Sequence, residues 1–164
     1  MYIVTILSTA VLLFLDQIAK YLAVLHLKGQ AAIPIIKNVF ELQYLENQGA
    51  AFGIMQGKKT FFVIGTLIFL VIVVILYHNI PLTKRFTPIR IVAVLIVAGA
   101  IGNMIDRVVH QYVIDFFYFK LINFPIFNVA DIYVVVACIL FILLMLFYYK
   151  EEELGQIFPF MKSK

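Results

Sequence analysis

With 64% hydrophobic and only 13% charged side chains over 164 residues, the chain is too apolar for a soluble globule, and its mean hydropathy of +1.04 indicates an integral membrane protein. The formal net charge of +4 comes from lysines and arginines scattered between apolar stretches, as membrane-edge anchors are, so we expect no nucleic-acid partner. No linker, charge block or internal repeat divides the chain, and we expect a single domain covering residues 1–164.

The first apolar stretch runs from Ile3 to about Leu25 and is long enough to cross ~30 Å of hydrocarbon as a helix. A cleaved signal peptide is the alternative interpretation. However, no basic segment precedes the stretch, and Asp16 and Lys20 fall in its second half. We therefore expect a permanent span.

The following stretch, residues 27–59, is interrupted by glycines, asparagines and a proline. Between Val39 and Leu45, hydrophobic and polar residues alternate roughly with a period of two, which predicts a short strand or two outside the hydrocarbon. We expect this segment to form an extramembrane cap, whose part from Val39 to Phe52 closes over a bound substrate.

Three further apolar stretches predict the remaining spans, at residues 61–77, 91–105 and 132–149. Gly99 and Gly102 in the third span permit close contact between helices. The connection at residues 108–130 is mixed, and residues 150–164 form a charged tail. The predicted fold class is an all-α membrane protein with four transmembrane helices and a small β-containing extracytoplasmic cap.

The number of spans also predicts an orientation. An even number places both termini on the same side of the membrane. The loop after the second span is short, basic and free of acids, so the positive-inside rule assigns this loop and both termini to the cytoplasm. The cap and any site beside it then lie at the outer face. Four lysines on that side weigh against this orientation: Lys28, Lys37, Lys58 and Lys59.

Polar side chains converge on one face of the bilayer, whichever way the chain is oriented. They lie at span ends that must share that face or in the loops joining them: Asp16, Lys20, Asn103, Asp106, Arg107, Asp115 and Asp131. The opposite half of the bundle has essentially no ionisable group. Ionisable residues beside spans are costly and usually mark function, so this convergence predicts a site.

Two of these residues, Asp115 and Asp131, lie in or beside the same connection between spans. Each has a structural explanation by itself: Asp115 as a solvated loop acid, and Asp131 as a helix N-cap. Together they favour a different hypothesis, because two adjacent carboxylates cannot both ionise easily. One keeps its proton and the other acts as a base, which is the division of roles needed to hydrolyse a peptide bond with water.

The other polar residues keep two interpretations each. Asp16 and Lys20 are four apart on a helix and can form an ion pair, or they can contact the cap or a substrate. Asn103, Asp106 and Arg107 share one face of a helix end and can serve as a cap and interfacial anchor. They can also orient a catalytic carboxylate or bind a lipid headgroup. Asn47 and Gly49 form part of a turn or of the site.

Other chemistries find little support in the sequence. The histidines at positions 26, 78 and 110 lack metal-ligand spacing, and neither a GxSxG motif nor a phosphate-binding glycine loop is present. Cys138, the single cysteine, fits the role of a small buried hydrophobe. A small transporter or channel subunit using Asp16, Lys20 and Asp106, or a structural assembly factor, remains as an alternative.

Five motifs appear in order along nearly the whole chain: DQIAK at 16–20, ENQGAAFG at 46–53, AGAIGNMIDR at 98–107, VIDFF at 113–117 and FPIFNVAD at 124–131. In this order, and with four spans, the sequence resembles bacterial lipoprotein signal peptidase, also called signal peptidase II.

The resemblance implies an aspartic endopeptidase of the bacterial cytoplasmic membrane that removes signal peptides from prolipoproteins, cutting before a diacylglyceryl-modified cysteine. Asp115 and Asp131 match the catalytic pair. The matched supporting positions are Asp16, Lys20, Asn47, Gly49, Asn103, Asp106, Arg107, Asn128 and Ala130. The resemblance implies no metal or organic cofactor, contact with membrane lipid, and inhibition by cyclic peptide antibiotics. We expect a monomer.

Overall fold

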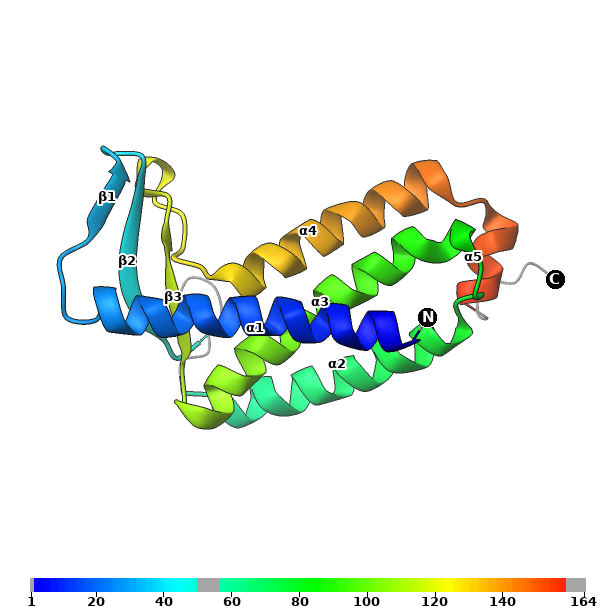
Figure 1. Ribbon diagram of the computed structural model, residues 1–164, viewed down its shortest axis with the longest axis horizontal. Coiled ribbons are helices and arrows are strands. Elements are labelled where there is room, and N and C mark those ends of the chain that lie inside the picture. The colour runs from blue at the N-terminus through cyan, green and yellow to red at the C-terminus, as the bar shows by residue number, and fades with distance from the viewer. Residues whose placement is uncertain (1, 50–56, 159–164) are drawn as a thin grey trace.

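The computed structural model describes residues 2–49 and 57–158. Within them, four long helices form a bundle, and a small sheet covers one end of it (Figure 1). The helices are α1 (Tyr2–Leu27), α2 (Lys59–Asn79), α3 (Thr87–Val109) and α4 (Val129–Leu143). All four are long and apolar enough to cross a membrane, counting with α3 and α4 the turns adjoining them. The predicted fold class is confirmed.

Each predicted span lies within or close to one helix, and the helices extend beyond the apolar stretches. The α3 helix begins at Thr87, with Pro88 in its first turn, where the missing N–H of proline costs nothing. At the end of α4, the regular helix stops at Leu143 and continues as a π-helical turn, Leu144–Tyr148, which the hydrophobic pattern did not indicate. Cys138 is exposed on the outside of α4, so its predicted burial within the protein is wrong.

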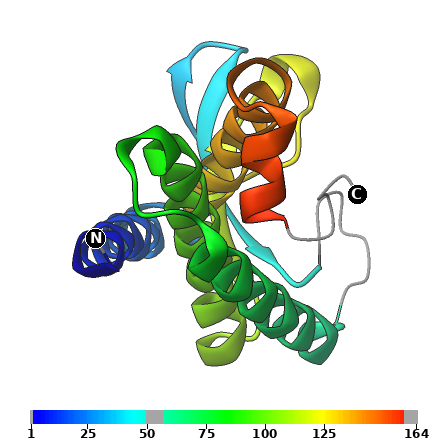
Figure 2. The same ribbon diagram turned by 90° about the vertical axis from the view of Figure 1, so that its right-hand side faces the viewer.

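The α3 helix is the centre of the bundle and packs against α1, α2 and α4. Figure 2, which looks along the bundle, shows it between α1 on one side and α2 and α4 on the other. Two glycines of α3 explain how closely α1 and α4 approach it. A Cβ atom added at Gly99 would lie 2.6 Å from the Ala130 carbonyl oxygen, and one at Gly102 would lie 2.5 Å from a carboxylate oxygen of Asp16. Both α1 and α4 therefore rest directly on the α3 backbone.

The sheet is formed by three antiparallel strands in the order β1 (Ile33–Ile36), β2 (Phe40–Asn47) and β3 (Val113–Tyr118). The predicted strand in the cap corresponds to β2, and the segment that contains Asp115 is extended, as β3. Pairing places Leu45 opposite Asp115, beyond a bulge in β2. The sheet is fixed to the bundle by an apolar cluster that joins α1 to β3, formed by Ala23, Leu27, Ile114 and Phe116.

The opposite end of the bundle holds a helix that was expected to be only a charged tail, α5 (Glu151–Ile157). Its apolar side buries Leu154 and Ile157 in a core cluster, while Glu153 pairs with Arg85 at 2.8 Å. Arg90 departs from the expected lack of ionisable groups in this half of the bundle. It lies within α3, is 5% exposed, and donates to backbone carbonyls at the end of α2 and in the turn that follows.

Candidate active site

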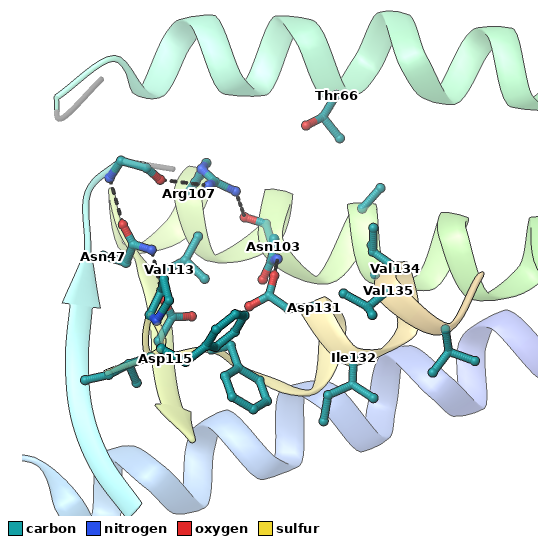
Figure 3. A pocket seen from close by; sticks show the side chains of 18 of the residues that line it. Asn47, Thr66, Asn103, Arg107, Val113, Asp115, Asp131, Ile132, Val134 and Val135 are labelled. Atoms are coloured by element: carbon teal, nitrogen blue, oxygen red, sulfur yellow. Dashed lines mark hydrogen bonds between the residues drawn. The ribbon is translucent and has the colours of Figure 1, made fainter. Parts of the chain in front are cut away.

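Asp115 and Asp131 reach one cavity from different elements. Asp115 lies in β3 and Asp131 in the first turn of α4, and both line a cavity of about 660 Å³ between the cap and the bundle. Figure 3 shows their carboxyl groups at the same end of this cavity, below Asn103 and Arg107. The fold therefore brings together the two acids that the sequence singled out.

The start of α4 fixes the Asp131 carboxyl group through a capping box. Asn128, not Asp131, is the N-cap residue: its side-chain oxygen accepts the Asp131 backbone N–H at 3.0 Å, and Asp131 Oδ2 accepts the Asn128 backbone N–H at 3.0 Å. The other carboxylate oxygen, Oδ1, accepts the Asn103 side-chain amide at 2.8 Å. Asp131 thus has a helix-capping role and still faces the cavity.

Two amide side chains hold the Asp115 carboxyl group. Asn47 Nδ2 donates to Oδ2 at 2.9 Å, and Asn128 Nδ2 donates to Oδ1 at 2.7 Å. Asn47 also accepts the backbone N–H of Gly49 at 3.0 Å, so its turn role and its site role coexist. Because the fully buried Asn128 contacts both acids, it fixes their relative position.

The surroundings of Asp115 favour its protonated form. The side chain is 1% exposed, and burial is the main cause that raises the pKa of this carboxyl group to about 7; the negative charge of Asp131 adds to it. The amides of Asn47 and Asn128 act in the opposite direction because they stabilise the carboxylate. Asp115 therefore keeps its proton to a higher pH than an ordinary carboxyl group does.

A buried ion cluster lies behind the two acids. Lys20 is 1% exposed, and its ammonium group lies 2.9 Å from Asp16, 2.9 Å from Asp106 and 3.0 Å from the side-chain oxygen of Asn103. The predicted pairing of Asp16 with Lys20 is present, but Lys20 also joins α1 to α3. A buried lysine needs such partners because an isolated charge is strongly disfavoured away from water.

Each carboxylate of this cluster also holds the backbone next to one of the two cavity acids. Asp16 Oδ1 accepts the backbone N–H of Ala130 at 2.9 Å, one residue before Asp131. Asp106 Oδ2 accepts the backbone N–H of Ile114 at 3.1 Å, one residue before Asp115. Lys20 binds both carboxylates, so a single ammonium group links the two segments that bear the cavity acids.

Gln17 also belongs to this cluster, although the sequence analysis did not predict it as a site residue. Its amide donates to Asp16 at 3.1 Å, to Asp106 at 3.2 Å and to the Gly102 carbonyl at 3.4 Å. A polar amide inside an apolar span was the available signal, because such groups usually bond across helices.

Arg107 connects α3 to the cap. Its guanidinium donates to the Gly49 carbonyl at 3.2 Å and to the Asn103 carbonyl at 3.3 Å, and it lies over the ring of Phe62. The next residues of the ENQGAAFG motif, 50–53, lie outside the described residues. The prediction that residues 39–52 close over a bound substrate therefore lies only partly within the described residues.

The rest of the cavity is largely apolar. Its walls combine small and β-branched residues of the helices with aromatic residues of the cap: Thr66, Gly99, Ala100, Ile132, Val134, Val135, Val136, Phe119, Phe124 and Phe127. In residues 2–49 and 57–158, no cluster of three or more His, Cys, Asp or Glu side chains could hold a metal ion. The site thus offers two carboxyl groups, amide donors and an apolar cavity.

Comparisons with known proteins point to one family over most of the chain. A family model described as Signal peptidase (SPase) II matches residues 8–147, which include every site residue described above. The lipoprotein signal peptidase of Caldanaerobacter subterraneus is 44% identical over 136 residues, covering 82% of this chain and 90% of the relative. That of Streptococcus pyogenes serotype M5 is 38% identical over 150 residues, covering 92% and 95%.

A solved structure described as a bacterial membrane enzyme, determined by the in meso method, is 32% identical with a TM-score of 0.76, covering 89% of this chain and 94% of the other. Sequence and fold thus agree over most of the chain. The chain therefore belongs to the signal peptidase II family, multi-pass bacterial membrane peptidases that remove signal peptides from lipoprotein precursors.

Proposed function

We propose that the chain is an aspartic endopeptidase in which Asp115 and Asp131 are the catalytic pair. The observation that carries this proposal is that both carboxyl groups line one largely apolar cavity and are joined through Asn128. The remaining supporting residues hold the pair in place: Asp16, Lys20, Asn47, Gly49, Asn103, Asp106, Arg107 and Ala130.

The two acids have different environments, which supports different roles for them. Asp115 has its pKa raised to about 7 and can carry a proton at neutral pH. Asp131 lies in the first turn of α4, where the helix dipole and the N-cap amide favour a negative charge. Asp115 is accordingly the proton donor and Asp131 the base in the first step.

In that step Asp131 takes a proton from a water molecule, whose oxygen attacks the scissile carbonyl carbon. Asp115 gives its proton to the carbonyl oxygen, so a neutral geminal diol forms without a free oxyanion. When the diol collapses, one of its hydroxyl protons returns to Asp115. Asp131 passes its proton to the amide nitrogen, the carbon–nitrogen bond breaks, and the pair returns to its starting state.

The cavity suits a substrate that is part lipid and part peptide. Its polar end holds the two acids, and its apolar walls include residues of α4 that are exposed on the outside of the bundle, such as Ile132 and Val135. We propose that a diacylglyceryl-modified cysteine stays in the membrane while the peptide bond before it reaches the acids. Cyclic peptide antibiotics would occupy the same cavity. Since one chain supplies both acids, a monomer suffices.

Support for an orientation comes from the basic loop between α2 and α3, which carries no acid. We propose that this loop and both termini are cytoplasmic and that the cap and the catalytic pair lie at the outer face of the bacterial cytoplasmic membrane. There the scissile bond can meet water while the acyl chains remain in the bilayer.

The test is to replace each acid with the isosteric amide. We expect Asp115→Asn and Asp131→Asn each to lower the cleavage of a diacylglyceryl-modified prolipoprotein in detergent by at least ~10²-fold, because general acid–base groups contribute on that scale. Glu46→Gln, on the exposed surface of the cap, is the matched control and should cleave normally. Near-normal turnover by either aspartate variant would remove that residue from the catalytic pair.

A further inference from the structure

The turn that joins β3 to α4 presents large apolar side chains at its tip. It consists of residues 119–124, with a short 3-10 helix at Lys120–Ile122. Leu121 is 69% and Ile122 68% exposed, and Phe119 and Phe124 beside them are 41% and 47% exposed. Water-facing turns normally carry small polar residues, and contiguous exposed apolar groups mark a binding surface.

The turn is held in place from several directions, so these side chains are not exposed through fraying. Lys120 pairs with Glu41 of β2 at 2.8 Å, and the Leu121 backbone N–H donates to the Val39 carbonyl at 3.3 Å. Asn123 adopts the left-handed conformation that the turn requires, with φ of 49°, and accepts the Tyr118 hydroxyl at 2.7 Å. The structure thus presents Leu121 and Ile122 in a fixed arrangement.

The position of the turn identifies what it meets. In Figure 1 the turn, in yellow, overhangs the flank of the bundle on the side of α4, and Figure 2 shows it next to α4 as well. Phe124 of the turn and Ile132 and Val135 of α4 line the same cavity, so the turn lies close to this part of α4. Ile132 and Val135 are 39% and 55% exposed on a helix that crosses the membrane.

We propose that the turn at residues 119–124 inserts Leu121 and Ile122 into the boundary between lipid headgroups and acyl chains, in the leaflet at the cap end of the bundle. The proximity of the turn to exposed apolar residues of a membrane-spanning helix favours lipid over a protein partner. Phe119 and Phe124 add exposed ring surface beside the two inserted side chains. The inserted turn would set the height of the cavity mouth relative to the bilayer, whichever residues carry the chemistry.

The chain contains no tryptophan, so a single introduced indole reports its own surroundings. We would prepare Leu121→Trp and Ile122→Trp in the full-length protein and reconstitute each into vesicles of phosphatidylglycerol and phosphatidylcholine. The phosphatidylcholine would carry bromine near the glycerol or near the middle of the acyl chain. We expect blue-shifted emission, stronger quenching by the shallow bromines than by the deep ones, and protection from acrylamide.

Two control positions calibrate the measurement. Ile139→Trp, 54% exposed on α4, should be quenched by the deep bromines. Gln30→Trp, in the exposed loop between α1 and β1 at the far end of the cap (Figure 1), should be quenched only by acrylamide. If both turn variants behave like Gln30→Trp, the turn lies in water or awaits a protein partner, and the proposal is wrong. Agreement at both positions supports it, and cleavage activity does not enter the readout.

Discussion

At the scale of single residues, the two cavity acids receive equal numbers of hydrogen bonds from different groups. Asp115 accepts two side-chain amides, from Asn47 and Asn128. Asp131 accepts one side-chain amide, from Asn103, and one backbone N–H at a helix start. Asp131 is therefore part of the helix start itself, while Asp115 depends on Asn47 of the cap and on Asn128, the N-cap residue of α4.

The raised pKa of Asp115 predicts a pH-dependent loss of stability. Its native pKa is about 7 and its ordinary value is 3.8, so the native state binds more protons than the unfolded state between these values. The contribution of Asp115 to stability is fully present below pH 3.8 and is lost as the pH rises through about 7. Asp115→Asn removes this decline, at most roughly 4 kcal/mol, from ~1.4 kcal/mol per pKa unit.

We expect Asp115→Asn to unfold at a higher temperature than the parent protein well above pH 7 and to lose this advantage near pH 4, measured by thermal unfolding in detergent. Glu46→Gln serves as the comparison. The pKa of Glu46 is lowered by its hydrogen bond from Lys28, so its pH dependence has the opposite sign. A constant difference between Asp115→Asn and the parent protein at both pH values would contradict the assigned protonation.

Lys20 predicts a second effect at this scale. Replacing Lys20 with Met leaves Asp16 and Asp106 buried without a counter-charge, which should cost about 3–5 kcal/mol of stability. Asp106→Asn combined with Lys20→Met should recover part of this loss, because it removes one charge and keeps an acceptor for Ile114. The measurement is again unfolding in detergent.

The control for this variant is Lys28→Met, which breaks an exposed ion pair with Glu46 and should change the stability little. If Lys20→Met were as stable as Lys28→Met, the buried cluster would not organise the site.

At the scale of elements, the site depends on how closely α4 approaches α3. Asp131 is carried by α4 and Asn103 by α3, and their 2.8 Å hydrogen bond spans the two helices. Gly99 lies one turn away on α3 and faces the start of α4, where a Cβ would meet Ala130 O at 2.6 Å and Val134 Cγ2 at 2.7 Å. Glycine, which has no Cβ, is therefore needed there for the two helices to share the site.

We predict that Gly99→Ala lowers stability by roughly 1–3 kcal/mol, the usual cost of overpacking, and lowers cleavage because it displaces Asp131 from Asn103. Gly65→Ala in α2 is the matched control, since a Cβ there meets nothing within 4 Å. That variant should gain about 0.5–1 kcal/mol from the better helix propensity of alanine. Thermal unfolding and cleavage assays check both. Unchanged activity in Gly99→Ala would show that the site tolerates a shift of α4.

At the scale of the whole molecule, the bundle separates two polar ends by an apolar middle. One end holds the cap and the acids, and the other holds α5 and the basic turn before α3. The α2 helix has no buried residue, so its apolar side chains are available to lipid. This arrangement places the two ends on opposite membrane faces, and the orientation proposal states which face each occupies.

Selective labelling tests the orientation. In a Cys138→Ser background, which removes the single cysteine, Lys37→Cys reports on the cap and Lys84→Cys on the turn between α2 and α3. Both positions are exposed. With a membrane-impermeant maleimide, we expect Lys37→Cys to react in intact cells and Lys84→Cys only after permeabilisation. The reverse pattern would place the proposed catalytic pair at the cytoplasmic face.

Much of the architecture was predictable because hydropathy is a local property. The run from Phe61 to Tyr77 has no charge, and it must be helical because a lipid environment leaves no other partners for its backbone. The β2 strand was predicted from its alternation of hydrophobic and polar residues, which is also a local property of the sequence. The convergence of polar residues on one membrane face followed from counting spans, without knowledge of any contact.

The contacts between residues far apart in the chain could not be predicted from the sequence and were seen only in the folded structure. Lys20 was expected to pair with Asp16, four residues away, and no local pattern indicated that it also binds Asp106 or that Asn128 bridges Asp115 and Asp131. Nor did the pattern indicate that the charged tail buries Leu154 and Ile157 as α5. Such contacts depend on the rotation of each helix about its axis and on the spacing of its neighbours. Helix rotation and spacing are set by packing between residues far apart in the chain, at glycines such as Gly99.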